Sequence, residues 1–248
     1  MEQAYYEEYA RVQAAHWWFA GRRRIIGSLL ERGLPASDGE RAILDVGCGT
    51  GTNLDELGRF GRVEGVEAEA AAVDYCRSHG GWSVTHASGD ELPYGDASFD
   101  LVTLLDVIEH VPDDATILGE ARRVLRPGGS VLVTVPAYTW MWGAQDEISH
   151  HYRRYTAVRL RSSLRDAGLD PQRVTYFNTL LFPPIAAIRL LRRLRPKPGE
   201  PTSDFELNEP GALNSMLARL FGLEASILRR ANLPFGVSAA ALARLGGP

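Results

Sequence analysis

A glycine-rich turn between an apolar segment and a helical segment constrains the fold of this chain more than any other feature. Residues 42–45 indicate a short β-strand. Glycines then occupy every second position, at Gly47, Gly49 and Gly51, and residues 53–57 indicate the start of a helix. Glycine adopts backbone angles that other residues avoid and lets a ligand approach the main chain, and helix N-termini favour anions. The segment therefore predicts a binding site for a nucleotide cofactor.

The spacing of these glycines argues against two common phosphate-binding loops. The dinucleotide fingerprint G-x-G-x-x-G would place its third glycine at position 52, where the chain has Thr52. No Gly-Lys-Ser/Thr follows the turn, so a P-loop is excluded as well. A plain strand-to-helix turn is the alternative at this point.

Apolar and amphipathic segments alternate along most of the chain, as α/β folds require. Besides the first strand, strands are indicated at residues 63–67, 84–87, 99–107, 130–135, 172–178 and 233–245. Helices are indicated at residues 4–32, 68–79, 113–125, 156–168 and 213–230. This pattern predicts an α/β fold with a doubly wound, mostly parallel seven-stranded sheet, an N-terminal helical lid and helical insertions after strands 5 and 6.

Composition limits the partners that the chain can have. A net charge of −4 and a pI near 5.9 argue against a general nucleic-acid surface. Cys48 and Cys76 share no metal-ligand spacing, and two cysteines make no disulfide framework. Residues 1–11 lack a signal-peptide pattern, and no run of 18 uncharged apolar residues indicates a membrane span. We expect a soluble, cytoplasmic protein.

Glu67 follows Gly47 by 20 residues, at the end of the second predicted strand. A carboxylate at this position can accept hydrogen bonds from the ribose hydroxyls of a nucleotide cofactor. The alternative is an ordinary surface glutamate.

Five motifs in this order resemble those of the class I S-adenosylmethionine (SAM)-dependent methyltransferases, in particular a bacterial small-molecule subgroup. They are Asp45–Gly51 (D-x-G-x-G-x-G), Glu67, Gly89–Pro93, Leu105–His110 and Arg126–Gly129. The resemblance covers residues 40–178. It implies a Rossmann-like fold, SAM as the cofactor and S-adenosylhomocysteine as the product.

The resemblance also implies a set of cofactor contacts. They are Trp18, Phe19, Arg23, Asp45, Gly47, Cys48, Gly49, Glu67, Ala68, Ser88, Gly89, Asp90, Leu105 and His110. In one respect the chain departs from the family, because many members place an aspartate where Ser88 stands. Either Ser88 contacts the adenine, or Asp90 replaces it after a shift of the loop.

The segment His16–Arg24 resembles the N-terminal element of the same subgroup. We expect a lid whose aromatic residues cover the cofactor and whose Arg23 pairs with the carboxylate of SAM. The alternative is a helix that packs on the sheet through its tryptophans and leaves three arginines in solvent.

Aromatic residues and histidines dominate the segments expected around the acceptor. The expected lining residues are Tyr5, Tyr9, Tyr138, Trp140, Trp142, His150 and Tyr152, and the candidate catalytic residues are His110, Tyr9, His16 and His151. The adjacent His150 and His151 raise the question of a metal, but no further ligand has convincing spacing, so we expect none.

These parts divide the chain into an N-terminal lid (1–35), a SAM-binding core (40–178) with an acceptor-site insertion (137–155), a helical cap (179–232) and a final strand (233–248). Residues 196–211 carry four prolines and four acids, which indicates a mobile loop.

The predicted function is methyl transfer from SAM to a small aromatic or lipophilic acceptor, such as an indole or phenol intermediate of natural-product (secondary) metabolism in a bacterium. The alternatives are an enzyme for a membrane-linked saccharide or polyprenyl acceptor, which would use the apolar and basic residues 180–195 at the membrane surface, and a non-catalytic SAM-binding subunit. Whether the chain forms a homodimer stays open.

Overall fold

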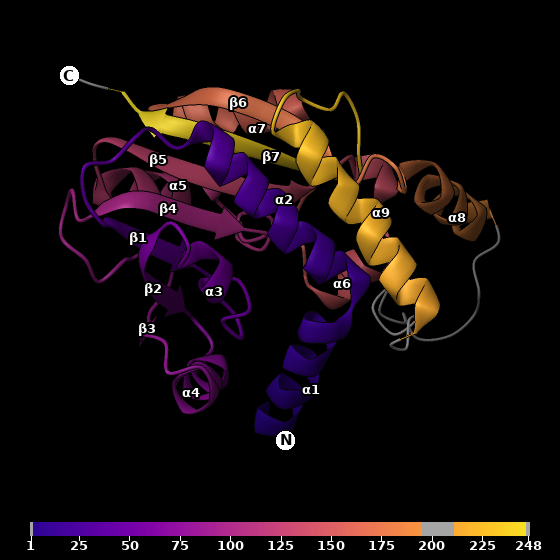
Figure 1. Ribbon diagram of the computed structural model, residues 1–248, viewed down its shortest axis with the longest axis horizontal. Helices are drawn as coiled ribbons and strands as arrows, with labels where there is room; N and C mark the ends of the chain where they lie inside the picture. The colour runs from indigo at the N-terminus through magenta and orange to yellow at the C-terminus, as the bar shows by residue number, and fades with distance from the viewer. Residues whose placement is uncertain (1, 195–210, 247–248) are drawn as a thin grey trace.

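The computed structural model describes residues 2–194 and 211–246, and shows helices alternating with strands (Figure 1). The strands are β1 (Arg41–Val46), β2 (Gly61–Glu67), β3 (Val84–His86), β4 (Phe99–Leu105), β5 (Leu125–Pro136), β6 (Leu169–Phe177) and β7 (Ser238–Leu245). The helices are α1 (Glu2–Ala15), α2 (Trp17–Gly33), α3 (Leu54–Leu57), α4 (Ala70–His79), α5 (Asp114–Val124), the 3-10 helix η1 (Thr139–Met141), α6 (Ala144–Ile148), α7 (Ala157–Asp166), α8 (Phe182–Leu194) and α9 (Ala212–Leu228). The loop predicted at 196–211 lies outside the described residues, apart from its last residue.

The predicted seven-stranded, mostly parallel sheet is confirmed. Its strand order is β3-β2-β1-β4-β5-β7-β6. Neighbouring strands from β3 to β5 pair in parallel, and β7 lies antiparallel between β5 and β6. The chain reverses its direction of winding between β1 and β4, which is where ligands bind in doubly wound sheets.

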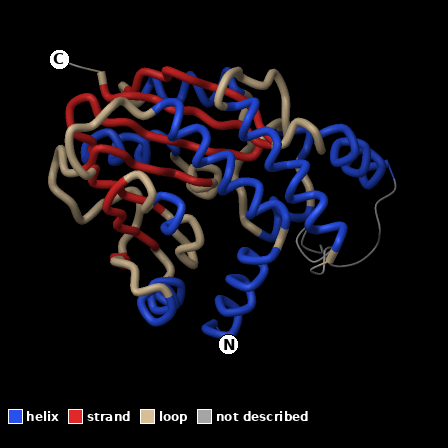
Figure 2. Tube along the Cα trace, in the orientation of Figure 1, coloured by secondary structure: helices blue, strands red, loops and turns tan. Residues whose placement is uncertain are grey.

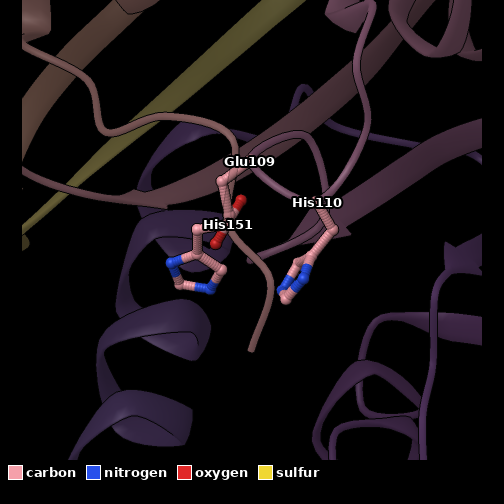
Figure 3. Close-up of side chains that lie close together, drawn as sticks. All are labelled: Glu109, His110 and His151. Carbon is pink, nitrogen blue, oxygen red and sulfur yellow. The ribbon is translucent and has the colours of Figure 1, made fainter. Parts of the chain in front are cut away.

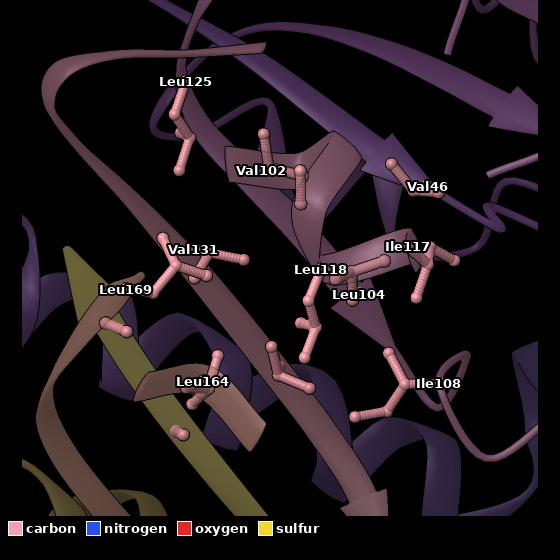
Figure 4. Close-up of a cluster of buried hydrophobic side chains, with 14 of the residues drawn as sticks. Val46, Val102, Leu104, Ile108, Ile117, Leu118, Leu125, Val131, Leu164 and Leu169 are labelled. Atoms are coloured by element: carbon pink, nitrogen blue, oxygen red, sulfur yellow. The ribbon is translucent and has the colours of Figure 1, made fainter. Parts of the chain in front are cut away.

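Helices cover both faces of the sheet. α2 and α9 lie on one face and α5 and α7 on the other (Figure 1). Successive strand residues alternate between the two layers, so that Leu44 packs on the side of α5 and Ile43 on the side of α2. On the face covered by α5 and α7, Val131 of β5 and Leu118 of α5 belong to one cluster of buried side chains (Figure 4). Burial on both faces explains why the central strands appear in the sequence as continuous apolar runs.

The N-terminal region is helical as predicted, but it forms two helices. His16 separates them with an extended backbone (φ −72°, ψ 136°), and its Nδ1 accepts a hydrogen bond from the Trp18 N–H at 3.2 Å. α2 then packs along α9, whereas α1 leaves the sheet and contacts α4 (Figure 1). The break at His16 thus allows α1 to reach the edge of the sheet where the glycine turn lies.

The C-terminal part contains α8 and α9 within residues 179–232 and β7 within residues 233–248, where helices and a strand were predicted. The division of the chain into lid, core and cap remains a prediction. Within residues 2–194 and 211–246, no helix combines the length and the apolar character that crossing a membrane requires.

We predict that Gly21→Ala weakens the packing of α2 on α9. A Cβ at position 21 would stand 2.2 Å from Cδ1 of Phe221, a buried ring that also contacts the rings of Trp17 and Phe177. Overpacking costs about 1–3 kcal/mol, whereas alanine gains only ~1 kcal/mol over glycine inside a helix. Urea unfolding should therefore show a net loss in the free energy of unfolding.

Gly119→Ala is the matched control. Gly119 lies inside α5, and a Cβ there meets no described atom within 4 Å. This variant should gain about 0.5–1 kcal/mol in stability. A Gly21→Ala protein as stable as the control would contradict the close packing of the two helices.

Candidate functional site

Three loops that carry predicted site residues meet at one edge of the sheet. The glycine turn follows β1, residues 106–113 follow β4, and residues 137–156 follow β5. Because β1, β4 and β5 run parallel, their carboxyl ends lie at the same edge. Figure 2 draws the loops that connect the strands and helices in tan. This edge is the candidate functional site.

The three glycines of the turn have left-handed backbones, with φ between 57° and 77°. A Cβ at position 47 would stand 2.8 Å from Cγ2 of Val107, and one at position 51 would stand 2.6 Å from the ring of Trp82. At Gly49 no described atom lies within 4 Å of such a Cβ. Packing therefore requires glycine at the two outer positions, whereas Gly49 leaves open space above the main chain for a ligand.

Glu67 is held in place by the turn. Its Oε2 accepts a hydrogen bond from the Gly49 N–H at 2.8 Å, and its Oε1 accepts one from the Glu69 N–H at 3.0 Å. Two backbone donors fix the plane of the carboxylate, and its remaining lone pairs stay available to a ligand. The neighbouring Ala68 is exposed.

Asp45 is buried at the end of β1, with one carboxylate oxygen unsatisfied. Its Oδ1 accepts a hydrogen bond from Thr103 Oγ1 at 2.5 Å, whereas no described group donates to its Oδ2. Burial raises the pKa of Asp45 to about 7, against the hydrogen bond from Thr103 and the charge of Arg22, which lower it. A cationic ligand group would stabilise the ionised form.

We predict that Asp45→Asn alters the pH dependence of stability. The pKa of Asp45 is about 7 in the folded protein and about 3.9 in the unfolded chain. The contribution of neutral Asp45 to the free energy of unfolding is therefore complete below about pH 4 and is lost as the pH rises through about 7. Denaturant unfolding between about pH 5 and 8 should therefore show wild type losing stability relative to the variant as pH rises. Parallel curves for the two proteins would contradict the raised pKa.

The N-terminal lid is attached to the glycine turn through Gln13. Its Oε1 accepts hydrogen bonds from the hydroxyls of Thr50 and Thr52, the latter at 3.2 Å. Phe19 is buried and meets the ring of Tyr9 edge-on at 6.3 Å. α1 therefore lies against the turn, and its role as a lid remains a prediction.

The arginines that follow Phe19 take different positions. Arg22 is buried, and its Nη2 lies 2.8 Å from Asp106 Oδ2 and donates to Thr134 Oγ1 at 3.1 Å. Its guanidinium also lies 5.2 Å from the centre of the half-buried Trp18 ring. Arg23, predicted to bind the cofactor, donates to the Gln13 carbonyl at 3.1 Å, and Arg24 is exposed. The alternative with three solvated arginines is wrong, because Arg22 joins α2 to the edge of the sheet.

The loop after β4 begins two residues earlier than predicted. Asp106 has a left-handed backbone (φ 58°), which ends the strand at Leu105 instead of at Val107. The Asp106 carboxylate forms an ion pair with Arg22 and accepts a hydrogen bond from Thr134 Oγ1 at 3.1 Å. Leu105 itself is buried.

Glu109, His110 and His151 come together on this loop and the next (Figure 3). Glu109 is fully buried, and the rings of His110 and His151 meet edge-on at 4.5 Å. His151 Nδ1 lies 2.9 Å from Oδ1 of the buried Asp146. Sequence spacing offered no further metal ligand beside His151, whereas the tertiary structure brings Glu109 and His110 next to it.

The aromatic residues after β5 form a cluster with α8 and β6. Tyr138 stacks on Trp140 at 5.8 Å and on Tyr176 at 5.2 Å, and Phe182 meets Tyr138 edge-on at 5.9 Å. We call these four residues the aromatic cluster. Of the other predicted lining residues, Trp142 is half-buried, His150 and Tyr152 are exposed, and the side chain of Tyr5 is not among those described.

The predicted adenine loop lies at the surface. Ser88 and Asp90 are exposed, and a Cβ at Gly89 would stand 2.7 Å from Cδ1 of Ile117. Cys48 packs in a small apolar cluster with Val73 and other residues, as a filler would. The cofactor roles of these residues remain predictions.

Comparison with known proteins identifies the family. A model described as "Methyltransferase domain" matches residues 44–133. A protein of Mycolicibacterium smegmatis, named a probable S-adenosylmethionine-dependent methyltransferase, is 36% identical over 134 residues, or 52% of each chain. A ubiquinone biosynthesis O-methyltransferase of Nitrosococcus oceani is 32% identical over 167 residues, or 58% of this chain and 71% of that one. This chain belongs to the class I SAM-dependent methyltransferases.

Structural comparison agrees on the fold. The cyclase SpnF superimposes on this chain with a TM-score of 0.59 and 22% sequence identity, covering 91% of this chain and 81% of that one. The chain spans about half the length of the first curated relatives, 52% and 56%. SAM is the cofactor of the family.

The edge of the sheet fits this cofactor. Gly49 leaves room above the turn, Glu67 presents a fixed carboxylate that suits ribose hydroxyls, and Asp45 has an oxygen without a donor, which suits the ammonium group of SAM. These assignments follow from the chemistry of the groups.

Several residues at this edge were not predicted from the sequence. Gln13, Asp106, Glu109 and Asp146 are all polar side chains that acquire their partners from other elements. Only Asp106 and Glu109 lay within a motif, Leu105–His110, and nothing in its local pattern marked either one.

We predict that Glu67→Gln weakens SAM binding by at least tenfold. An amide keeps the size of the side chain but loses the charge, and hydrogen bonds to charged groups contribute about 1.5–3 kcal/mol. Calorimetric titration with SAM or S-adenosylhomocysteine measures the effect. The exposed Glu69→Gln is the control, and equal affinities of the two variants would refute the ribose assignment.

Proposed function

We propose that this protein transfers the methyl group of SAM to a small-molecule acceptor at the carboxyl edge of its sheet. The supporting observation is the glycine turn, where the Gly49 N–H holds the Glu67 carboxylate and space is open at Gly49, in the segment that follows Asp45 with its unpartnered buried oxygen. Family membership supports the same reaction.

When bound, SAM supplies a methyl group on a positively charged sulfur, which is already activated for transfer. The protein then has to hold the donor and the acceptor in line and keep water away. Glu67 and Asp45 would hold the donor, and α1, attached through Gln13, would cover it. Orientation of this kind contributes ~7–11 kcal/mol toward lowering the barrier.

The acceptor in our proposal is aromatic or lipophilic and lies between the polar loop after β4 and the aromatic cluster. Tyr138 and Trp140 of that cluster follow β5 directly, and Trp140 is partly exposed. One relative is named an O-methyltransferase of ubiquinone biosynthesis, which agrees with a hydroxyl acceptor. A natural-product intermediate of the indole or phenol type stays within this proposal.

The four candidate bases differ in their surroundings. His16 caps α2 through Nδ1, and burial lowers its pKa. Tyr9 packs edge-on against Phe19. His110, by contrast, is exposed directly after β4 and touches His151. We therefore place the acceptor beside His110 and His151.

Two measurements test the proposal. Calorimetry should show that SAM and S-adenosylhomocysteine bind at micromolar concentrations. Incubation with SAM carrying a labelled methyl group and a panel of phenols, indoles and hydroxylated lipophilic compounds should yield a labelled product. Failure of both ligands to bind would overturn the proposal. Binding of SAM without methyl transfer would favour a role other than methylation. The structural neighbour SpnF, which has the same fold, is named a cyclase.

A membrane-linked acceptor is the second candidate, and α8 is the observation that favours it. Ile188, Leu190 and Leu191 of this helix are 49%, 49% and 61% exposed. An apolar surface of this kind can bind to a bilayer. Co-sedimentation with anionic liposomes that Leu191→Glu abolishes would favour this candidate, and no co-sedimentation of wild type would remove it.

A further inference from the structure

The cluster of Glu109, His110 and His151 has the composition of a metal site. Each residue offers one ligand atom, and these atoms all lie within 4.8 Å of one another. Glu109 and His110 come from the loop after β4, whereas His151 comes from the loop after α6 (Figure 3). Two imidazoles and one carboxylate are a ligand set used by catalytic zinc and by non-haem iron.

The carboxylate of Glu109 is buried without a hydrogen-bond donor among the described residues. The side chain is 0% exposed, and no other described residue donates a hydrogen bond to either of its oxygens. An ionised carboxylate is costly in such a place unless a cation or hydrogen-bond donors compensate it.

The nearby arginines are engaged elsewhere. Arg22 pairs with Asp106, and Arg154 donates to both oxygens of Asp146 at 2.7 and 2.9 Å. Arg154 also donates to the Ala137 carbonyl at 2.9 Å. Both guanidinium charges favour the ionised form of Glu109, but neither arginine donates a hydrogen bond to its carboxylate, so both oxygens stay available as ligands.

His151 is oriented as metal-binding histidines are. Its Nδ1 lies 2.9 Å from Asp146 Oδ1, and Asp146 is itself fixed by Arg154 and by the Gly143 N–H at 2.8 Å. Burial opposes ionisation of Asp146, but the hydrogen bonds from His151 and Arg154 hold its pKa well below the usual range. A carboxylate on Nδ1 fixes the tautomer that leaves the Nε2 lone pair available to a cation.

The backbone also directs His151 to Glu109. His150 adopts a left-handed conformation (φ 52°), which non-glycine residues rarely do, and the Tyr152 N–H donates to the Glu109 carbonyl at 2.8 Å. The hydrogen bond of Tyr152 joins the two loops directly after His151.

We propose that Glu109, His110 and His151 bind one divalent transition-metal cation of the Zn²⁺ or Fe²⁺ class. Three protein ligands leave further coordination positions for water or for an oxygen of an acceptor. Hard cations such as Mg²⁺ prefer all-oxygen sites, so this site selects against them. The proposal does not depend on methyl transfer, because cation binding needs neither SAM nor an acceptor.

Titration of the chelator-treated full chain with Co²⁺ tests the site, with visible absorption and calorimetry as readouts. We expect one equivalent to bind, one equivalent of Zn²⁺ to displace it, and excess Mg²⁺ to leave it in place. Binding of no cation, or displacement by Mg²⁺, would overturn the proposal.

Three variants locate the cation. Glu109→Gln keeps the buried shape but loses the charge, and His110→Gln removes an exposed imidazole. Each should weaken Co²⁺ binding by more than tenfold. Among the proposed ligands Asp146 hydrogen-bonds to His151, so Asp146→Asn should weaken Co²⁺ binding by about 10–100-fold, as changes to the partner of a metal-binding histidine do.

His79→Gln is the matched control, because His79 is exposed on α4 and outside the cluster. Binding that is unchanged in both His110→Gln and Glu109→Gln, or lost in His79→Gln, would show a cation held elsewhere and overturn the proposal. Calorimetric titration of the same proteins with S-adenosylhomocysteine measures cofactor binding separately. Loss of Co²⁺ binding with intact S-adenosylhomocysteine binding would therefore concern the metal site and not the proposed methyl transfer. Circular dichroism identifies any variant that does not fold.

Discussion

The parallel alignment of β1, β4 and β5 is the constraint on which the candidate site depends. Parallel neighbours send the loops at their carboxyl ends to one edge of the sheet, so the glycine turn, the loop after β4 and the loop after β5 meet there. Parallel strands in turn require crossover helices, which bury both faces of the sheet. The same arrangement thus produces the core and gathers the polar residues.

Charge balance at this edge separates structural residues from ligand-binding candidates. Asp106 is compensated by Arg22, and Asp146 by Arg154 and His151. These pairs are complete and join α2 and the loop after β5 to the edge of the sheet.

Asp45 and Glu109 are buried at the same edge, and each has carboxylate oxygens without a donor among the described residues. The proposed ligands are cationic in both cases: the ammonium of SAM at Asp45 and a divalent metal at Glu109. A neutral carboxylic acid is the other way to bury such a group, and the raised pKa values of both residues show how costly the charged form is without a ligand.

Local sequence determined most of the fold and the part of the site where we propose that SAM, the methyl donor, binds. Alternation of apolar runs and amphipathic segments gave seven strands and their order along the chain, because these patterns repeat over two to four residues. The glycine turn and Glu67 were also predictable, since their spacing is imposed by one strand, one turn and the next strand. Tertiary structure alone decided that Arg22 and not Arg23 reaches Asp106, because neighbouring helical residues point in different directions and the partner lies 84 positions away. It likewise decided that His151 meets Glu109, because contacts between distant loops follow from strand pairing and buried charge, which leave no periodic pattern in the sequence.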